Sequence, residues 1–505
     1  MAKKDQTKKP RVKREATLAE SIILILLLFA IFGAGAVFGL NYVPLMVFVG
    51  AFAAFVGWRC GYTWKEMEEA VAKRVQNSFS VIVMLLGIGF MLAGLMFSGV
   101  LPMIIYYGLQ IVEPRWIALC GFVLCAIFST ATGTSNGSAS TAGMAIMIMA
   151  MAMDNVNVGL VAGAVYAGSM FGDKLSPLSD TTVLAPMTAN VDLFDHIATQ
   201  ARVTVPAAIV SIIIYVIVGL TSHTTGAAVS AESTALLTDI ASLFKFNVLL
   251  LIPIVFIIWG SLTGKPATLV MFGAGFIGII LGVVIQGFSI TDGINALYGG
   301  FKASYCLAVH PDIAADSLSS ATMTLLERGG ISDMNKTFVA TIFCFYFAGI
   351  AELIGVLRAL LNTAGAFIKG TGSLILTTGI MTVILIMVGG SSTVALLLSG
   401  SMFKEKYDEM GVNRVNLSAT LEHFGTGCSG FFPWTSSGML YLAVLFQDST
   451  FTFLKYSYFS WLVWIFALIC AFTGFNFQKG PTKRQLAAME AEKAEQAEAV
   501  AAKAN

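Results

Sequence analysis

The chain has 505 residues, of which 57% are hydrophobic and only 12% are charged. Soluble globular proteins carry about 25% charged residues, so this composition excludes an ordinary soluble domain. The net charge of +1 points to no particular partner, and we expect no binding to nucleic acid.

Apolar runs recur along the chain from its first fifty residues onward. The clearest are residues 21–40, 79–98, 203–220 and 338–357, each long enough to cross the hydrocarbon core of a lipid bilayer. The first run follows a charged tail and has no small-residue cleavage site, so it is predicted to be a span and not a signal peptide. We therefore expect an all-α polytopic membrane protein with roughly 10–14 membrane segments.

The distribution of basic residues predicts the orientation of the chain. Residues 1–20 form a densely basic tail, whereas the stretch Thr221–Phe244 contains no Lys or Arg. Basic segments stay on the cytoplasmic side, so the amino tail and the charged tail 479–505 are both predicted to be cytoplasmic. The expected location is the cytoplasmic (inner) membrane.

An internal repeat relates the two halves. An offset of 256 residues aligns Ser98–Leu101 with Ile354–Leu357, Pro177 with Pro433, and the Gly/Ser/Thr-rich segment Thr132–Thr141 with Val388–Leu397. We predict a first repeat at 21–222, an extracytoplasmic linker at 223–246 and a second repeat at 247–478. Because the first repeat begins inside and ends outside, the second has the opposite orientation. Such inverted repeats are typical of secondary transporters, whose site lies near the membrane midplane between the repeats.

Each half contains two polar, helix-breaking segments within apolar surroundings. They are residues 129–141 and 172–182 in the first half and 389–400 and 425–438 in the second. Broken backbone and charges are tolerated at membrane depth only where they line protein or water. Neutral side-chain oxygens with one carboxylate suit a partly dehydrated monovalent cation. The candidate site residues are Ser135, Asn136, Asp173, Asp180, Ser391, Ser392, Thr435 and Ser436.

The two aspartates of the second break are the predicted Na⁺ ligands. Asp173 and Asp180 are separated by Pro177, and each can hold a cation when ionised or a proton when neutral. A site that takes Na⁺ or H⁺, but not both, exchanges one for the other. Lys174 could pair with an aspartate in the unloaded state; alternatively, Asp173 and Lys174 form a structural ion pair at a helix end.

Other ionisable residues have weaker assignments. Glu352, Glu422 and His423 are candidates for a proton relay, although a structural hydrogen bond or a buried core histidine explains them equally well. Asp192, Asp195, His196 and Arg202 are expected to be solvated in a cytoplasmic loop. Seven scattered cysteines predict neither a disulfide framework nor a zinc site, and no HExxH or GxSxG motif is present. We expect no enzyme activity and no cofactor.

The segment "GDKLSPLSDTTVLAP" (Gly172–Pro186) resembles the signature of NhaC-type sodium/proton antiporters. "LLERGGI" (Leu325–Ile331), "NLSATLEHFGT" (Asn416–Thr426) and "FPW" (Phe432–Trp434) resemble further landmarks of this family in the same order. The resemblance adds Ser176 and Thr181 to the transport site. It also implies paired hairpins, elevator-type motion, a homodimer and the wider ion transporter superfamily, which includes malate/lactate exchangers.

Three positions depart from the family pattern. Relatives commonly have an acidic residue and Asn where this chain has His423 and Thr435, and often Asn in place of Val183. These changes remove polar ligands from the second-half side. Two functions therefore stay open: a secondary antiporter exchanging Na⁺ for H⁺, and a Na⁺- or H⁺-coupled transporter or exchanger of a small carboxylate or amino acid.

Overall fold

The computed structural model describes residues 12–480 apart from 39, 41, 78, 154, 223–230, 264, 320–321, 324–325, 328, 448, 476 and 479. All regular structure in these residues is helical, which confirms the predicted all-α class. The tail 479–505 lies outside the described residues except for Gly480, as do residues 1–11 of the amino tail and residues 223–230 of the linker 223–246.

The first half contains the helices α1 (Leu18–Phe38), α2 (Tyr42–Arg59), α3 (Trp64–Asn77), α4 (Phe79–Ser98), α5 (Val100–Ile111), α6 (Ile117–Thr132), α7 (Ser135–Ser138), α8 (Met144–Ala152), α9 (Val158–Leu175), α10 (Asp180–Ala189) and α11 (Leu193–Thr221). A single π-helical turn, η2 (Ala139–Gly143), joins α7 to α8. Helix α12 (Ala231–Leu243) falls in the predicted linker.

The second half contains α13 (Ile252–Leu262), α14 (Ala267–Leu281), α15 (Ile290–Gly299), α16 (Ala303–Val309), α18 (Asn335–Leu353), α19 (Val356–Ala364), α20 (Thr371–Gly389), α21 (Ser392–Glu409), α22 (Arg414–Thr420), α23 (Ser436–Val444), α24 (Thr450–Leu454) and α25 (Tyr458–Thr473). A π-helical turn, η8 (Leu421–Gly425), and a 3₁₀ turn, η9 (Thr426–Phe431), follow α22.

Six helices in the described part of the chain are long and apolar enough to cross a membrane. Two further pairs pass the same test but are bent, by 73° between α4 and α5 and by 102° between α12 and α13, and counting each as one span gives eight. In the same described residues, three apolar helices are shorter than a full span, namely α2, α19 and α25. The sequence predicted 10–14 segments because composition does not show where an apolar run bends.

The two halves repeat the same order of elements. In each, a long helix ends at a left-handed glycine, Gly99 after α4 and Gly355 after α18, where a short helix follows at once. Glycine tolerates positive φ without steric cost, which explains the residue at both bends. The next helices, α6 and α20, also end at left-handed glycines, and each leads into a Ser/Thr-rich helix start.

Contacts between the two halves occur as matching pairs. A helix of the first half packs on the second half, and its counterpart in the second half packs on the equivalent part of the first. Helix α4 packs on α14 of the second half, while its counterpart α18 packs on α2 and α3 of the first. Likewise α10 packs on α21, while its counterpart α23 packs on α7 and η2. Such reciprocal contacts are what a twofold relation between the halves produces. The opposite membrane orientation of the halves stays a prediction.

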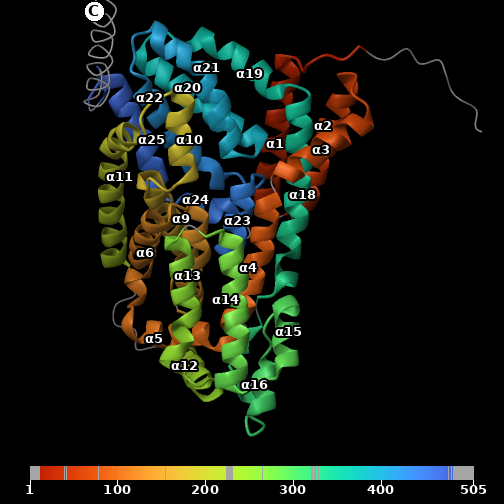
Figure 1. Ribbon diagram of the computed structural model, residues 1–505, viewed down its shortest axis with the longest axis vertical. Coiled ribbons are helices and arrows are strands. Elements are labelled where there is room, and N and C mark those ends of the chain that lie inside the picture. Colours follow the sequence, from red (N-terminus) through yellow and green to blue (C-terminus); the bar gives the residue numbers. More distant parts are fainter. Residues whose placement is uncertain are drawn as a thin grey trace, which may run out of the picture.

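The broken segments lie between these interlocked halves. Helices α9 and α23 sit near the middle of the long axis, while α19, α21, α22 and the start of α11 lie toward the end where both ends of the described chain are found (Figure 1). Helix α9 is fixed there by close packing on α6. A Cβ added at Gly168 would lie 2.1 Å from the Phe122 carbonyl oxygen, so only glycine allows this approach. Gly168 and Gly172 form the small-xxx-small pattern common at membrane helix interfaces.

Candidate transport site

The break after α9 is built by local hydrogen bonds around a proline. Pro177 cannot continue the helix because it lacks an amide hydrogen. The Ser176 amide makes the last helical bond, to the Gly172 carbonyl at 3.1 Å. Ser179 then caps α10, and the Thr182 hydroxyl donates back to the Asp173 carbonyl oxygen at 3.0 Å. The two helix ends are thereby held against each other.

Asp173 lies at this break and is only 8% exposed. The hydroxyls of Ser179 and Ser135 face its carboxylate as hydrogen-bond donors, and Ser135 begins α7, in the other first-half break. The Tyr441 side chain, from α23 of the second half, faces Ser135 and Asp173. A carboxylate among hydroxyl oxygens offers hard ligands that suit Na⁺ or a proton.

Tyr441 was missed by the sequence analysis. Its hydroxyl is fully buried and has no hydrogen-bond partner in the part of the chain that the structure describes. Its ring packs edge-on against Tyr166 with a 4.6 Å centroid separation. Tyr166 in turn donates to the Gly427 carbonyl at 3.0 Å. Its position in the sequence could have identified Tyr441 as a site residue, because it lies just over one turn into the helix that follows the second proline break.

Lys174 pairs with Glu422 rather than with an aspartate. The ammonium donates to the Glu422 carbonyl and to the Thr426 hydroxyl at 2.7 Å, and lies 3.6 Å from the Glu422 carboxylate. Thr426 donates to that carboxylate at 2.7 Å, so one hydroxyl connects both charges. Lys174 is 2% exposed and Glu422 is fully buried. The alternative of a structural Asp173–Lys174 ion pair is therefore not what the structure shows, because Lys174 forms a bridge between the halves.

The second-half candidates lie at a break of their own. The Thr435 hydroxyl caps α23, accepting from the Gly438 amide at 3.0 Å and donating to the Ser429 carbonyl at 2.5 Å. Ser436 donates to the Gly390 carbonyl at 3.2 Å. Ser391 and Ser392, at the start of α21, are half-buried. The described contacts commit Thr435 and Ser436 to backbone partners and do not place them on Asp173.

Asp180 and Asn136 also differ from Asp173 in their surroundings. Asp180 is exposed at the start of α10 and lines a cavity of about 340 Å³ together with Thr134 and Lys265. Asn136 is half-buried. Thr181 shares a 3.3 Å hydroxyl contact with Ser179, and the buried Ser176 hydroxyl accepts from the Leu178 amide. The intervening break thus turns the two aspartates toward different environments.

The three candidates for a proton relay also differ in how far they are buried. Glu422 and His423 are buried in η8, whereas Glu352 is exposed near the end of α18. The prediction that Asp195 and His196 are solvated is wrong, because α11 begins at Leu193 and encloses both in its first turn. His196 is fully buried, and its Nδ1 lies 2.9 Å from the Ser418 hydroxyl.

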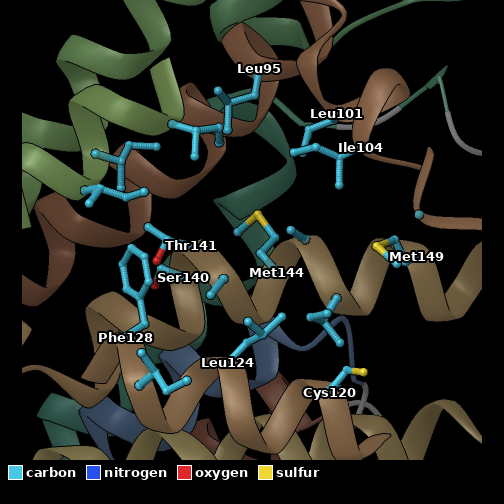
Figure 2. Close-up of a pocket in the computed structure, with 18 of the residues that line it drawn as sticks. Leu95, Leu101, Ile104, Cys120, Leu124, Phe128, Ser140, Thr141, Met144 and Met149 are labelled. Carbon is cyan, nitrogen blue, oxygen red and sulfur yellow. The ribbon is translucent and has the colours of Figure 1, made fainter. Parts of the chain in front are cut away.

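A second cavity, of about 440 Å³, lies beside the first hairpin, which is formed by α6 and the segment α7–η2–α8. Met144, Met149, Leu124 and Phe128 point into it, with Ser140 and Thr141 from η2 at one edge (Figure 2). Its remaining walls come from α4, α5 and α13. None of the described residues that line it is charged, so it is unsuited to an ion, and the Met-rich run acts here as adaptable packing.

The chain is similar to known proteins over most of its length. A model described as the Na⁺/H⁺ antiporter family matches residues 168–475. An uncharacterized Na⁺/H⁺ antiporter of Haemophilus influenzae is 35% identical over 92% of this chain and 98% of its own. The malate-2H⁺/Na⁺-lactate antiporter of Bacillus subtilis is 32% identical over 91% and 96%, and the Na⁺/H⁺ antiporter NhaC of Alkalihalophilus pseudofirmus is 28% identical over 93% and 98%.

Proposed function

Because the chain belongs to the Na⁺/H⁺ antiporter family, we propose that it exchanges Na⁺ for H⁺ at Asp173 by alternating access. The protein is a multi-pass membrane protein and a secondary transporter, not an enzyme. The proposal that exchange takes place at Asp173 depends on one observation. The Asp173 carboxylate is buried and surrounded by hydroxyls, where the ends of α7, α9 and α10 meet the second half.

The chemistry of exchange follows from this environment. A buried carboxylate is costly to leave ionised and unpaired, so it retains either a proton or a metal cation. The hydroxyls of Ser135 and Ser179 can rotate, offering their oxygens to Na⁺ or their hydrogens to the empty carboxylate. Occupancy by one ion excludes the other, which couples the two fluxes.

The test uses purified protein in proteoliposomes with a preset pH gradient. A Na⁺ pulse should collapse the gradient for the wild type and for Asp312→Asn, which changes an exposed acid outside the site. Asp173→Asn should abolish the response while the protein remains folded. Wild-type exchange by Asp173→Asn, or no response of the wild type to Na⁺ or Li⁺ from neutral to alkaline pH, would refute the proposal.

A second function is supported by a specific observation. The Lys174 ammonium is buried beside Asp173, and a positive group at this depth suits a substrate carboxylate. The 32% identical relative is named as an exchanger of malate and lactate. Stabilisation of the protein by a small organic acid or amino acid, without a response to Na⁺ alone, would favour this function over Na⁺/H⁺ exchange.

The remaining expectations concern arrangement in the membrane. We propose that both termini are cytoplasmic, that the protein lies in the inner membrane and that it forms a homodimer. The apolar cavity beside the first hairpin supports elevator-type motion, because such a surface can slide past α13 without breaking polar contacts. Cysteines placed near each terminus should react with impermeant reagents only in inside-out vesicles.

A further inference from the structure

Helix α11 carries a buried polar stripe. His196, Gln200 and Thr204 are each fully buried and are spaced four residues apart. Side chains at this spacing lie on one face of a helix, so the stripe extends over about 12 Å. In the described part of the chain, His196 Nε2, both amide atoms of Gln200 and Thr204 Oγ1 have no hydrogen-bond partner.

The turn η8 packs against this helix and adds two more such atoms. Glu422 Oε1 and His423 Nε2 are buried and have no partner among the described residues, and the His423 ring lies against the backbone of Gln200. Six of the eleven unpartnered buried polar atoms found in the described residues therefore belong to the stripe and to the turn η8 that packs against α11. Lys174 of α9 interacts electrostatically with both histidines, Asp173 and Cys428 lie close to the Lys174–Glu422 pair, and Asp195 precedes His196 on α11.

Buried polar atoms are almost always hydrogen-bonded, to protein or to ordered water. A single buried polar atom without a hydrogen-bond partner can be tolerated, but six such atoms on two elements that pack together predict a common partner. A buried water makes about three hydrogen bonds, so a short file of waters would satisfy the whole group. The atoms offered include donors and acceptors, which is what a water file requires at successive positions.

We propose that the stripe and η8 enclose a water-filled proton route from the turn between α10 and α11 to the Lys174–Glu422 pair. This rests on the proposed function, and it assigns His196 as a proton relay and Gln200 and Thr204 as residues that position the waters. The start of α11 lies toward the same end of the molecule as the described chain ends, so the route opens at the predicted cytoplasmic face (Figure 1).

The hydrogen bonds of His196 fix how its ring takes part. The Ser418 hydroxyl donates to the Val415 carbonyl at 2.9 Å, so its oxygen accepts from His196 Nδ1. Nδ1 therefore carries the hydrogen, which leaves the lone pair of Nε2 free to accept a hydrogen bond. A proton taken up at Nε2 is passed from the same atom to the next water, which returns the ring to its neutral form. The route delivers the proton to the Glu422 carboxylate, which is close enough to Asp173 to interact with it electrostatically and from which the proton passes to the exchange site.

Replacement of Gln200 tests the route by rate. Gln200→Leu should slow Na⁺/H⁺ exchange by roughly tenfold or more, while Na⁺ still stabilises the purified protein against heat as in the wild type. Ser211→Ala is the matched control, because this buried hydroxyl of α11 bonds to the Ala207 carbonyl outside the stripe. Wild-type turnover by Gln200→Leu would overturn the proposal. If Gln200 had only a structural role, an apolar side chain could replace it at little cost in stability and without slowing exchange.

Accessibility tests the route without any transport. Thr204→Cys should react with 2-aminoethyl methanethiosulfonate faster than Ala274→Cys, which is equally buried in α14, a helix that packs on α4 and α13. Intact-mass measurement, with the wild-type chain as baseline for its seven cysteines, reports the modification. Equal lack of reaction at both positions would overturn the water-filled route, and this result holds whether or not the protein exchanges Na⁺.

Discussion

Removal of the Lys174 charge tests the bridge between the halves. At 3.6 Å, and at the effective dielectric constant of about 20 suited to protein sites, attraction between the Lys174 ammonium and the Glu422 carboxylate amounts to about 5 kcal/mol. Breaking a buried pair by removing one partner typically costs about 3–5 kcal/mol, because the other charge is left uncompensated. We therefore expect Lys174→Met to lower the free energy of unfolding by about 4 kcal/mol.

The double variant Lys174→Met/Glu422→Gln removes both charges and should recover most of this loss. Unfolding of the four proteins in detergent, arranged as a double-mutant cycle, gives the coupling between the two side chains. The pair Lys406–Glu409, at 2.8 Å but 40% and 62% exposed, provides the control and should show a coupling below about 1 kcal/mol. A Lys174–Glu422 coupling as small as that of the control would refute the reasoning.

Three further outcomes follow from the structure. Gly168→Ala forces α6 and α9 apart, since its Cβ would contact the Phe122 backbone, and should destabilise the protein by about 1–3 kcal/mol in thermal unfolding; an unchanged midpoint would contradict the packing. Tyr441→Phe should weaken Na⁺-dependent stabilisation without loss of fold, whereas unaltered Na⁺ affinity would remove Tyr441 from the site. The hydrogen bond from Arg414 lowers the pKa of Asp408, so this carboxylate stabilises the fold above about pH 4 and loses that effect as the pH falls through its folded-state pKa. Asp408→Asn should therefore cost no more than about 1 kcal/mol at neutral pH and nothing in strong acid, and an equal cost at both would contradict this origin.

The sequence was sufficient for the class of fold and for the location of the breaks. Apolar length predicted helices, and Pro177 and Pro433 predicted where α9 and the turn before α23 end. Both follow from local backbone chemistry, which short segments already contain. The Gly99 and Gly355 bends were not predicted, because a single glycine inside an apolar run is compatible with a continuous helix.

Side-chain partners across the halves were beyond the reach of sequence reasoning. Lys174 meets Glu422 and Asp173 meets Tyr441 only because the halves exchange contacts, and no local pattern specifies that register. His196 was placed in a solvated loop because polar residues surround it; its burial depends on α11 starting earlier than its apolar run. Reading α11 by its four-residue spacing, and not by average polarity, would have revealed the stripe.

The charges of the buried cluster predict the stoichiometry of exchange. Asp173 and Glu422 contribute two negative charges and Lys174 one positive charge, which leaves a net charge of −1 when His196 and His423 are neutral. A net buried charge is costly, so the cluster is most stable with one added monovalent cation, either Na⁺ or H⁺. Exchange should therefore be one for one and electrically silent.

Transport in proteoliposomes should neither generate a membrane potential nor respond to one imposed with K⁺ and valinomycin. In the Lys174→Met variant the cluster carries −2 and should retain an additional proton, which makes its exchange more sensitive to high pH than that of the wild type. Potential-driven Na⁺ movement by the wild type would show that the cluster takes more than one cation per cycle and that this charge balance does not govern the exchange.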